Sequence, residues 1–217
     1  MFRRLADYRV FFAEFRRTFR TTGAILPSGR ALSRALAHHV RTSAEPQRIL
    51  EVGPGTGAVT AEIVAGLKPH DQLELVELNE RFVECLRARF ATDPAFQPAA
   101  ARSRVIQGRL EELAGGAPYD VVVSGLPLNN FSAAEVEHLL GVLQGLVRPG
   151  GTLSFFEYVD IRRAKSVLSG SVQRQRLQGI GHALGKLFRS HPTEHRCVLA
   201  NIPPAWVHHV RIARGQM

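Results

Sequence analysis

The chain has 217 residues, which fits one domain with a short extension and allows a core to form without stabilising disulfides. Its two cysteines, Cys85 and Cys197, lack the spacing of metal ligands and argue against a disulfide framework, so a cytoplasmic protein is expected. No uncharged apolar run approaches the roughly 18 residues of a membrane-spanning helix, and the arginine-containing N-terminus does not resemble a signal peptide.

The net charge of +9 is distributed unevenly along the chain. Residues 1–41 carry a net charge of +7, residues 42–160 carry −7, and residues 161–217 carry +9. Two basic ends around an acidic middle favour a polyanionic partner, which is either an anionic membrane or a nucleic acid. Arginines that are only scattered over a solvated surface remain the alternative.

The first segment, residues 3–20, has the pattern of an amphipathic helix. At 100° per residue its apolar side chains fall within an arc of about 120°. These side chains are Leu5, Tyr8, Phe11, Phe12, Phe15 and Phe19. Arginines occupy the neighbouring arc, a composition typical of helices that lie in a membrane interface. Residues 1–22 are therefore expected to form a membrane-contacting helix, with docking on the rest of the chain as the alternative, and residues 23–217 to form the main domain.

Strands and helices alternate through the rest of the chain. Ser28 is expected to cap a helix that runs to about His39. The expected strands are 48–52, 73–77, 103–108, 119–124, 152–159, 194–202 and 205–212. The expected helices between them are 57–67, 80–90, 132–147 and about 161–189. The alternation predicts an α/β, Rossmann-like fold with a seven-stranded, mostly parallel sheet, and the short link at Pro203-Pro204 makes the last strand antiparallel.

The segment "EVGPGTGAV" at 51–59 follows the first strand, where such folds bind a cofactor. Gly53, Gly55 and Gly57 allow a sharp turn and close approach of a ligand, in a spacing that differs from dinucleotide and P-loop motifs. Glu51 would repel a pyrophosphate but suits a ligand with an ammonium and a sulfonium group. Glu77 ends the next strand, where an acidic side chain accepts the ribose hydroxyls. A cationic, ribose-bearing ligand without phosphates is S-adenosylmethionine, and no metal is expected.

These features resemble those of the class I methyltransferases over residues 23–212. The resemblance implies that Glu51 faces the methionine end, Glu77 binds the ribose and Leu78 lies beside the adenine. It also places the following residues at the cofactor: Ser28, Gly53, Gly55, Thr56, Gly57, Leu110, Ser124 and Gly125. Arg109 stands where the family usually has an acid for the adenine amino group, and arginine accepts no hydrogen bond. The adenine is then expected to contact the backbone near Leu110, or Glu111 or Glu112.

A narrower resemblance comes from four segments: "RTTGAILPSGRALSRALA", "EVGPGTGAVT", "VVSGLPLNNF" and "NIPPAWV". Together they are similar to bacterial phospholipid N-methyltransferases, which methylate phosphatidylethanolamine stepwise toward phosphatidylcholine. This implies an enzyme held on the inner face of the cytoplasmic membrane by basic segments, with no nucleic acid and no obligate protein partner. Arg162, Arg163 and Lys165 would form a second membrane contact, or only a solvated face. Ornithine-lipid N-methyltransferases remain a close alternative.

The loop after the fourth strand, "SGLPLNN" at 124–130, is expected to receive the methyl acceptor. Pro127 fixes the turn and leaves the Leu126 carbonyl free to orient an amine. Tyr158 ends the fifth strand and is expected either to orient the same nitrogen or to be an ordinary core or rim side chain. Leu126 and Tyr158 are thus the catalytic candidates, because methyl transfer depends chiefly on positioning and charge placement.

The segment "NIPP" at 201–204 resembles the Asn-Pro-Pro-aromatic motif of amino-methyltransferases. By strand order it is expected to be a turn away from the cofactor end of strand four, with Trp206 packed behind it. The adjacent pairs His38-His39 and His208-His209 are expected at the surface or partly buried rather than on a metal.

Two other functions remain open. A ribosomal RNA adenine dimethyltransferase also has a proline-containing loop after its fourth strand, and basic ends would then bind phosphates. That family carries an additional C-terminal helical domain and an aromatic side chain after the proline, where this chain has Leu128. A membrane-bound protein that binds the cofactor without catalysis is the second alternative, favoured by Arg109 alone.

Overall fold

The computed structural model describes residues 29–42, 44–159 and 171–213. The predicted helix at 3–20, the candidate Ser28 and the basic residues 162–165 lie outside the described residues. The strands are β1 (Arg48–Val52), β2 (Gln72–Glu77), β3 (Ser103–Gln107), β4 (Tyr119–Ser124), β5 (Val147–Tyr158), β6 (Thr193–Val198) and β7 (Ala205–Arg211).

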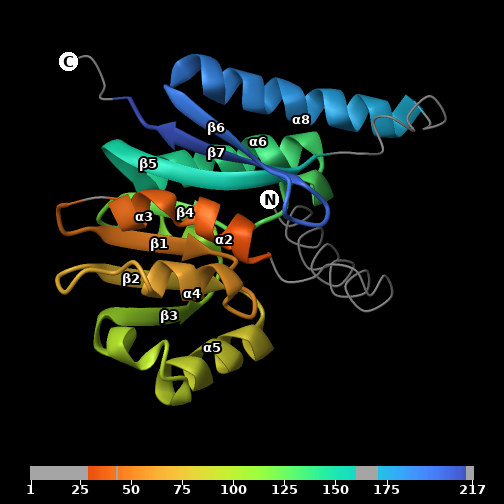
Figure 1. The fold of residues 1–217 in the computed structure, drawn as a ribbon. Helices are drawn as coiled ribbons and strands as arrows, with labels where there is room; N and C mark the ends of the chain where they lie inside the picture. The colour runs from red at the N-terminus through yellow and green to blue at the C-terminus, as the bar shows by residue number, and fades with distance from the viewer. Residues whose placement is uncertain (1–28, 43, 160–170, 214–217) are drawn as a thin grey trace.

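The seven strands form one sheet in the order β3-β2-β1-β4-β5-β7-β6. Neighbouring strands from β3 to β5 are parallel, whereas β7 runs antiparallel to both β5 and β6. Figure 1 shows β1, β2 and β3 pointing the same way, so that their carboxyl ends share one edge of the sheet. The predicted α/β fold, with its antiparallel last strand, is confirmed.

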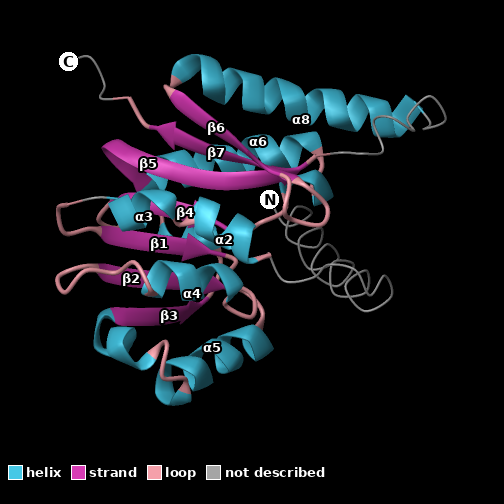
Figure 2. Cartoon of the chain, in the orientation of Figure 1, coloured by secondary structure: helices cyan, strands magenta, loops and turns pink. Residues whose placement is uncertain are grey.

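Helices cover both faces of the sheet (Figure 2). They are α2 (Arg30–Leu36), α3 (His38–Thr42), α4 (Ala58–Val64), α5 (Glu80–Thr92), α6 (Ala133–Leu146) and α8 (Ser171–Ser190), with short 3-10 turns at η1 (Gln97–Arg102), η2 (Leu110–Leu113) and η3 (Leu128–Asn130). The first four helices pack on one face, and α6 and α8 pack on the other. Ser132 caps α6 as predicted, because its side chain accepts from the Glu135 N–H while the Glu135 carboxylate accepts from the Ser132 N–H.

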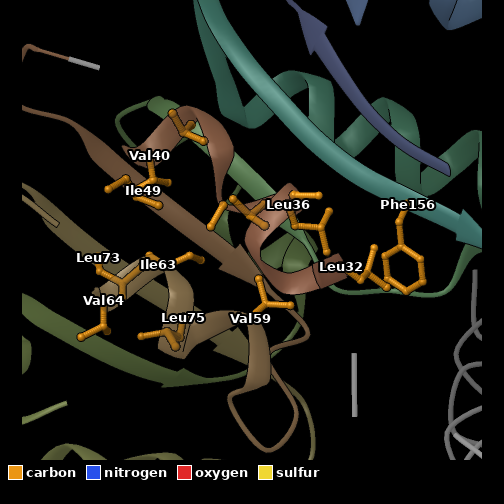
Figure 3. Close-up of a cluster of buried hydrophobic side chains, with 14 of the residues drawn as sticks. Leu32, Leu36, Val40, Ile49, Val59, Ile63, Val64, Leu73, Leu75 and Phe156 are labelled. Carbon is orange, nitrogen blue, oxygen red and sulfur yellow. The ribbon is translucent and has the colours of Figure 1, made fainter. Parts of the chain in front are cut away.

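Each face of the sheet has its own apolar core. On the first face Leu32 and Leu36 of α2 lie near Val59 of α4 and Phe156 of β5 (Figure 3). The side chains of Ile49 and Leu50 alternate between the two faces and are both completely buried. A central strand covered on both faces requires such a continuous apolar sequence, which explains "VVV" at 121–123 in β4.

Several element boundaries differ from the prediction. Strand β6 ends at Val198 rather than at residue 202, and α4 ends at Val64 rather than at residue 67. The helix expected to run from Ser28 to His39 begins at Arg30 after Gly29 and breaks at Ala37 before α3. Strand β5 begins at Val147 rather than at residue 152. The Pro149-Gly150-Gly151 segment was expected to precede the strand, but Gly150 takes a left-handed conformation (φ 79°), and the ladder with β4 continues across an irregularity in register.

The turn at 199–204, between β6 and β7, corrects another prediction. Ala205 at the start of β7 pairs with Tyr158 at the end of β5. The turn therefore lies at the carboxyl edge of the parallel strands, the edge that carries the glycine loop, and not away from it. Trp206 is 39% exposed and so is not packed behind the turn.

The two histidine pairs have different environments. His38 and His39 are half-buried, as expected, but His208 and His209 are buried in β7. The Ser154 hydroxyl lies 2.8 Å from His209 Nδ1, and burial lowers the pKa of His209 to about 3. His208 and His209 are therefore part of the core and not of the surface.

Candidate functional site at the carboxyl edge of the sheet

The glycine loop lies between the ends of β1 and β2. Gly53, Gly55 and Gly57 all have positive φ angles, of 66°, 57° and 86°, which side chains of L-residues rarely adopt. The Gly53 N–H donates to the Val76 carbonyl oxygen at 3.0 Å. Gly57 then precedes α4 directly, so that the loop turns from the strand into a helix as the sequence predicts.

Glu77 holds the loop in place from the end of β2. Its carboxylate accepts the Gly55 N–H at 3.1 Å and the Asn79 N–H at 2.9 Å. Burial raises the pKa of Glu77, and the backbone N–H groups of Asn79, Gly55 and Leu78 offset part of the rise. A carboxylate has about four acceptor sites, so these two bonds leave capacity for the hydroxyls of a ligand.

An open cavity of about 530 Å³ lies above this edge of the sheet. Its walls come from the ends of β1 and β2, the segment after β3 and the loop after β4. The lining residues are Val52, Gly53, Val76, Glu77, Leu78, Gly108, Arg109, Leu110, Glu111, Leu126, Phe131 and Leu139. The structure thus brings together five of the predicted site residues, Gly53, Glu77, Leu78, Leu110 and Leu126, together with Glu111, which was expected as an alternative adenine contact. It adds Phe131 and Leu139, which the sequence did not single out.

Glu51 lies outside the lining of this cavity and is completely buried in β1. Burial raises the pKa of its carboxyl group to about 8, and the neighbouring Thr60 offsets part of that rise, while Glu77 adds to it. Neither carboxylate oxygen has a hydrogen-bond partner of ordinary geometry among the described residues. Buried polar groups are rarely left unpaired, so the ammonium group of a ligand would be a suitable hydrogen-bond donor to this carboxylate.

The loop after β4 contacts the glycine loop directly. The Gly125 N–H donates to the Val52 carbonyl oxygen at 2.8 Å. A Cβ atom on Gly125 would lie 2.7 Å from the Gly53 carbonyl oxygen, and one on Gly53 would lie 2.6 Å from Leu126 Cδ2. Close approach to backbone therefore requires glycine at Gly125, whereas Gly53 is required by its positive φ angle, and the Leu126 side chain forms the cavity wall that faces the glycine loop.

Asn129 fixes the far end of the same loop. Its side chain accepts the Tyr158 N–H at 2.9 Å and donates to the Tyr158 carbonyl oxygen at 3.4 Å, so it mimics a paired strand at the end of β5. Arg176 of α8 donates to the carbonyl oxygens of Asn129 and Phe131. Neither residue was predicted from the sequence, although the paired asparagines at 129–130 were a visible signal of unusual turn chemistry.

The remaining predicted residues lie further from the cavity. Tyr158 packs beside Phe156 on the α2–α5 face, and it is not among the cavity-lining residues. Burial raises the pKa of its hydroxyl group. Thr56 is exposed and its carbonyl oxygen accepts from Arg89, while Ser124 is completely buried, with its hydroxyl 3.4 Å from the Leu126 N–H.

Comparison with known proteins agrees with this geometry. Residues 49–151, which contain the glycine loop and the loop after β4, match the sequence model of a family described as "Methyltransferase domain". An O-methyltransferase from Bacillus cereus, solved in complex with S-adenosylhomocysteine, superimposes with a TM-score of 0.62 at 16% identity, over 82% of this chain and 80% of that one. TomG from Streptomyces achromogenes, an O-methyltransferase solved with S-adenosylmethionine, gives 0.61 at 18% identity, over 85% and 79%. The fold is that of a class I methyltransferase.

Sequence relatives divide between two kinds of methyltransferase. An ornithine lipid N-methyltransferase of Singulisphaera acidiphila is 27% identical over 69% of this chain and 77% of its own length. A ribosomal RNA small subunit methyltransferase A of Synechococcus sp. is 38% identical, but over 47% of this chain. The alignment spans only 35% of that relative. The relatives therefore agree on methyl transfer and differ in the methyl acceptor.

The residues at this edge fit S-adenosylmethionine on three grounds. The glycine loop leaves Gly55 open, with nothing within 4 Å of a Cβ placed there. Glu77 retains acceptor capacity at the cavity, and Glu51 is a buried acid whose carboxyl oxygens have no hydrogen bond of ordinary geometry among the described residues, although Thr60 lies close enough to lower its pKa. Together with the matched methyltransferase domain, this confirms the expected cofactor.

Proposed function

We propose that this protein transfers methyl groups from S-adenosylmethionine to the amine of a membrane lipid, with phosphatidylethanolamine and its methylated intermediates as the substrates. The observation that carries the proposal is the apolar wall beside the glycine loop. Leu126 and Phe131 line the cavity there, and Leu128 is completely buried in the core. Position 128 carries leucine rather than an aromatic ring that would stack on a nucleobase. Phe131, the ring that does line the cavity, belongs to an apolar wall that suits the glycerol and acyl part of a lipid next to its polar headgroup.

The cofactor would supply an electrophilic methyl group on a sulfonium, which an amine lone pair attacks in line. Glu77 would hold the ribose, Leu78 and Leu110 would lie beside the adenine, and the Glu51 carboxylate would pair with the cationic methionine end. These residues bind and orient, and most of the rate comes from placing the amine and the methyl group in line.

The acceptor amine would be oriented by the loop after β4. Among the described residues, no hydrogen bond ends on the Leu126 carbonyl oxygen. This oxygen is available to accept an N–H of the amine and so to direct its lone pair. A protonated amine must first release a proton, which the open cavity lets pass to water. Tyr158 lies on the α2–α5 face and outside the cavity lining, so the Leu126 carbonyl oxygen is the group proposed to orient the nitrogen.

A lipid that stays in its bilayer requires the enzyme to work on the membrane surface. The basic, amphipathic pattern at 3–20 supports an anionic membrane as the partner and attachment to the inner face of the cytoplasmic membrane, and it argues against nucleic acid. Among the described residues, no helix is both long and apolar enough to cross a membrane.

Ornithine lipid is the second candidate substrate. The observation that favours it is the relative from Singulisphaera acidiphila, whose alignment extends over most of both chains. Both lipids offer a primary amine to the same loop, so the cavity geometry does not distinguish them.

The deciding experiment offers the purified chain labelled S-adenosylmethionine with three acceptors in parallel. These are vesicles of phosphatidylethanolamine, vesicles that contain ornithine lipid, and ribosomal RNA. We expect label in phosphatidylethanolamine, with successive methylated products. Label in ornithine lipid alone would make ornithine lipid the substrate instead of phosphatidylethanolamine, while the protein would still be a lipid N-methyltransferase. Label in RNA alone would overturn the lipid proposal. Cofactor binding without transfer to any acceptor would favour a protein that binds without catalysis.

A further inference from the structure

The turn between β6 and β7 exposes large apolar side chains. Leu199 is 76% exposed, Ile202 is 77% exposed and Trp206 is 39% exposed. Single exposed apolar residues are normal on soluble proteins, but these three are the large hydrophobic residues that the described surface exposes, and they fall within eight positions of one another. Such a concentration marks a contact surface.

Hydrogen bonds hold this turn firmly in place. Asn201 is buried between the exposed residues, and its amide accepts the Gly29 N–H at 2.9 Å and donates to the Pro203 carbonyl oxygen at 2.7 Å. The Val159 N–H donates to the Pro204 carbonyl oxygen at 2.7 Å. Because the buried amide and the backbone fix the turn, Leu199 and Ile202 are presented to the outside by a defined structure.

Three arginines lie beside the turn. An open groove of about 1080 Å³ is lined by Arg30 and Arg34 of α2 and by Arg196 of β6, and it continues to Leu199. The acids nearby are Glu62, 3.4 Å from Arg30 Nε and 4.0 Å from Arg34 Nε, and Glu194 beside His39. The side chains of Arg30 and Arg34 remain largely exposed, at 89% and 64%. Leu199 is thus flanked by cationic side chains, whereas Trp206 projects from the α8 side of the sheet, as its strand neighbours His208 and Val210 do.

This surface lies at the same edge of the sheet as the cofactor loop. The turn follows β6 where β7 begins to pair with the end of β5, and β5 is parallel to β4. Figure 1 shows the β6–β7 connection on the side toward which β1, β2 and β3 point. A planar partner on the turn would therefore face the edge that carries Gly53 and Leu126.

We propose that Leu199, Ile202 and Trp206, with Arg30, Arg34 and Arg196, form a membrane-docking surface for an anionic phospholipid bilayer. The inference takes its lipid partner from the proposed function and adds a docking site within the described residues. Leu199 and Ile202 enter the interface, Trp206 lies at its boundary, and the arginines bind lipid phosphates. Docking in this orientation turns the loop after β4 toward the headgroups that carry the amine.

The first test measures binding of the full chain to vesicles of phosphatidylcholine with phosphatidylglycerol, which contain no primary amine to methylate. We expect the double variant Leu199→Ser/Ile202→Ser to bind about tenfold more weakly or worse, because both side chains lose apolar area buried in the interface. Arg34→Gln/Arg196→Gln should weaken binding most at low salt. The matched control, Arg87→Gln/Arg104→Gln, removes two exposed charges near the β3 end of the sheet and should bind more tightly than Arg34→Gln/Arg196→Gln.

Trp206 gives a second readout, since it is the only tryptophan of the chain. Its fluorescence should shift to shorter wavelength on vesicle binding and be quenched by brominated phospholipid. Unchanged Trp206 emission in chains that sediment with vesicles would overturn the proposal, as would unchanged affinity of the Leu199/Ile202 variant. A variant that instead changes the oligomeric state would assign the surface to a second copy of the chain.

The outcomes also separate this inference from the proposed function. If the Leu199/Ile202 variant binds vesicles normally while the wild type methylates phosphatidylethanolamine, the docking surface is wrong and the proposed function stands. If the wild type docks through this turn but transfers no methyl group to any lipid, the docking surface stands and the proposed function is wrong.

Discussion

Gly125 is the residue at which the loop after β4 contacts the glycine loop. From the sequence alone, Gly125→Val is expected to abolish transfer and largely spare cofactor binding. The structure changes that expectation, because the atom nearest to a Cβ at this position is the carbonyl oxygen of Gly53, at 2.7 Å. Backbone cannot rotate away as a flexible side chain can, so the glycine loop itself must shift.

We therefore predict that Gly125→Ala reduces both cofactor binding and methyl transfer and lowers the free energy of unfolding by about 1–3 kcal/mol. Titration calorimetry with S-adenosylhomocysteine and denaturant unfolding measure the two effects. Gly141→Ala in α6 is the matched control, since nothing lies within 4 Å of its added Cβ and alanine favours a helix by about 1 kcal/mol. Wild-type cofactor affinity in Gly125→Ala would contradict the prediction.

The position of the glycine loop could be predicted from the sequence, because it follows from local spacing. Three glycines after a strand, with acids at Glu51 and Glu77, located the loop, because a doubly wound fold fixes where such residues meet. Asn129 was missed for a different reason. Its partner is the backbone of Tyr158, 29 residues later, and only the packed sheet brings the two together.

At the scale of elements, the loop after β4 is held at both ends. Gly125 bonds to the end of β1, and Asn129 bonds to the end of β5. We predict that Asn129→Ala lowers the free energy of unfolding by about 1–3 kcal/mol, since two backbone groups lose their partner. Methyl transfer should fall while cofactor affinity is retained. Asn130→Ala is the control, because Asn130 is exposed and its replacement should change stability by less than about 0.5 kcal/mol.

Stability and the rate of transfer should be measured on both asparagine variants in the same buffer. If Asn129→Ala behaves like Asn130→Ala in both, the bond to Tyr158 does not position the loop. Loss of cofactor affinity in Asn129→Ala would also contradict the separation of roles between the two ends of the loop.

The boundaries of the central strands were predictable, because β1 and β4 are apolar segments that end at glycine. The start of β5 was not. Pro149, Gly150 and Gly151 have the composition of a turn that precedes a strand. In the structure, however, a Cβ on Gly151 would lie 2.7–3.0 Å from Val147, Asp120 and Arg148. These glycines let the chain pass closely under its neighbours within the strand, which composition alone does not reveal.

At the scale of the whole molecule, one buried carboxyl group links stability to pH. Burial raises the pKa of Glu51 from 4.5 to about 8, so the unfolded chain releases this proton at a lower pH than the folded one. The stabilisation is complete below pH 4.5 and is lost as the pH rises toward 8. We predict that this group lowers the free energy of unfolding of the ligand-free protein over that range by at most about 5 kcal/mol.

Denaturant unfolding across this pH range tests the prediction. Glu51→Gln should flatten the dependence, whereas Glu84→Gln, at an exposed position of α5, should leave it unchanged. Cofactor affinity should rise with pH in the wild type, because the ionised carboxylate pairs with a cationic ligand, and it should lose this dependence in Glu51→Gln. An unaltered pH profile in Glu51→Gln would show that another group is responsible.

The hydrogen bond between Gly29 and Asn201 joins positions 172 residues apart in the chain. Helix α2 therefore lacks one of its anchors until the final hairpin has left the ribosome. At about 5–20 residues per second, that interval is on the order of ten to thirty seconds. Throughout it the edge of β5 also lacks β7, its antiparallel neighbour. Synthesis of the β6–β7 hairpin therefore completes two contacts at once, the Asn201 bond to Gly29 before α2 and the pairing of β7 with β5.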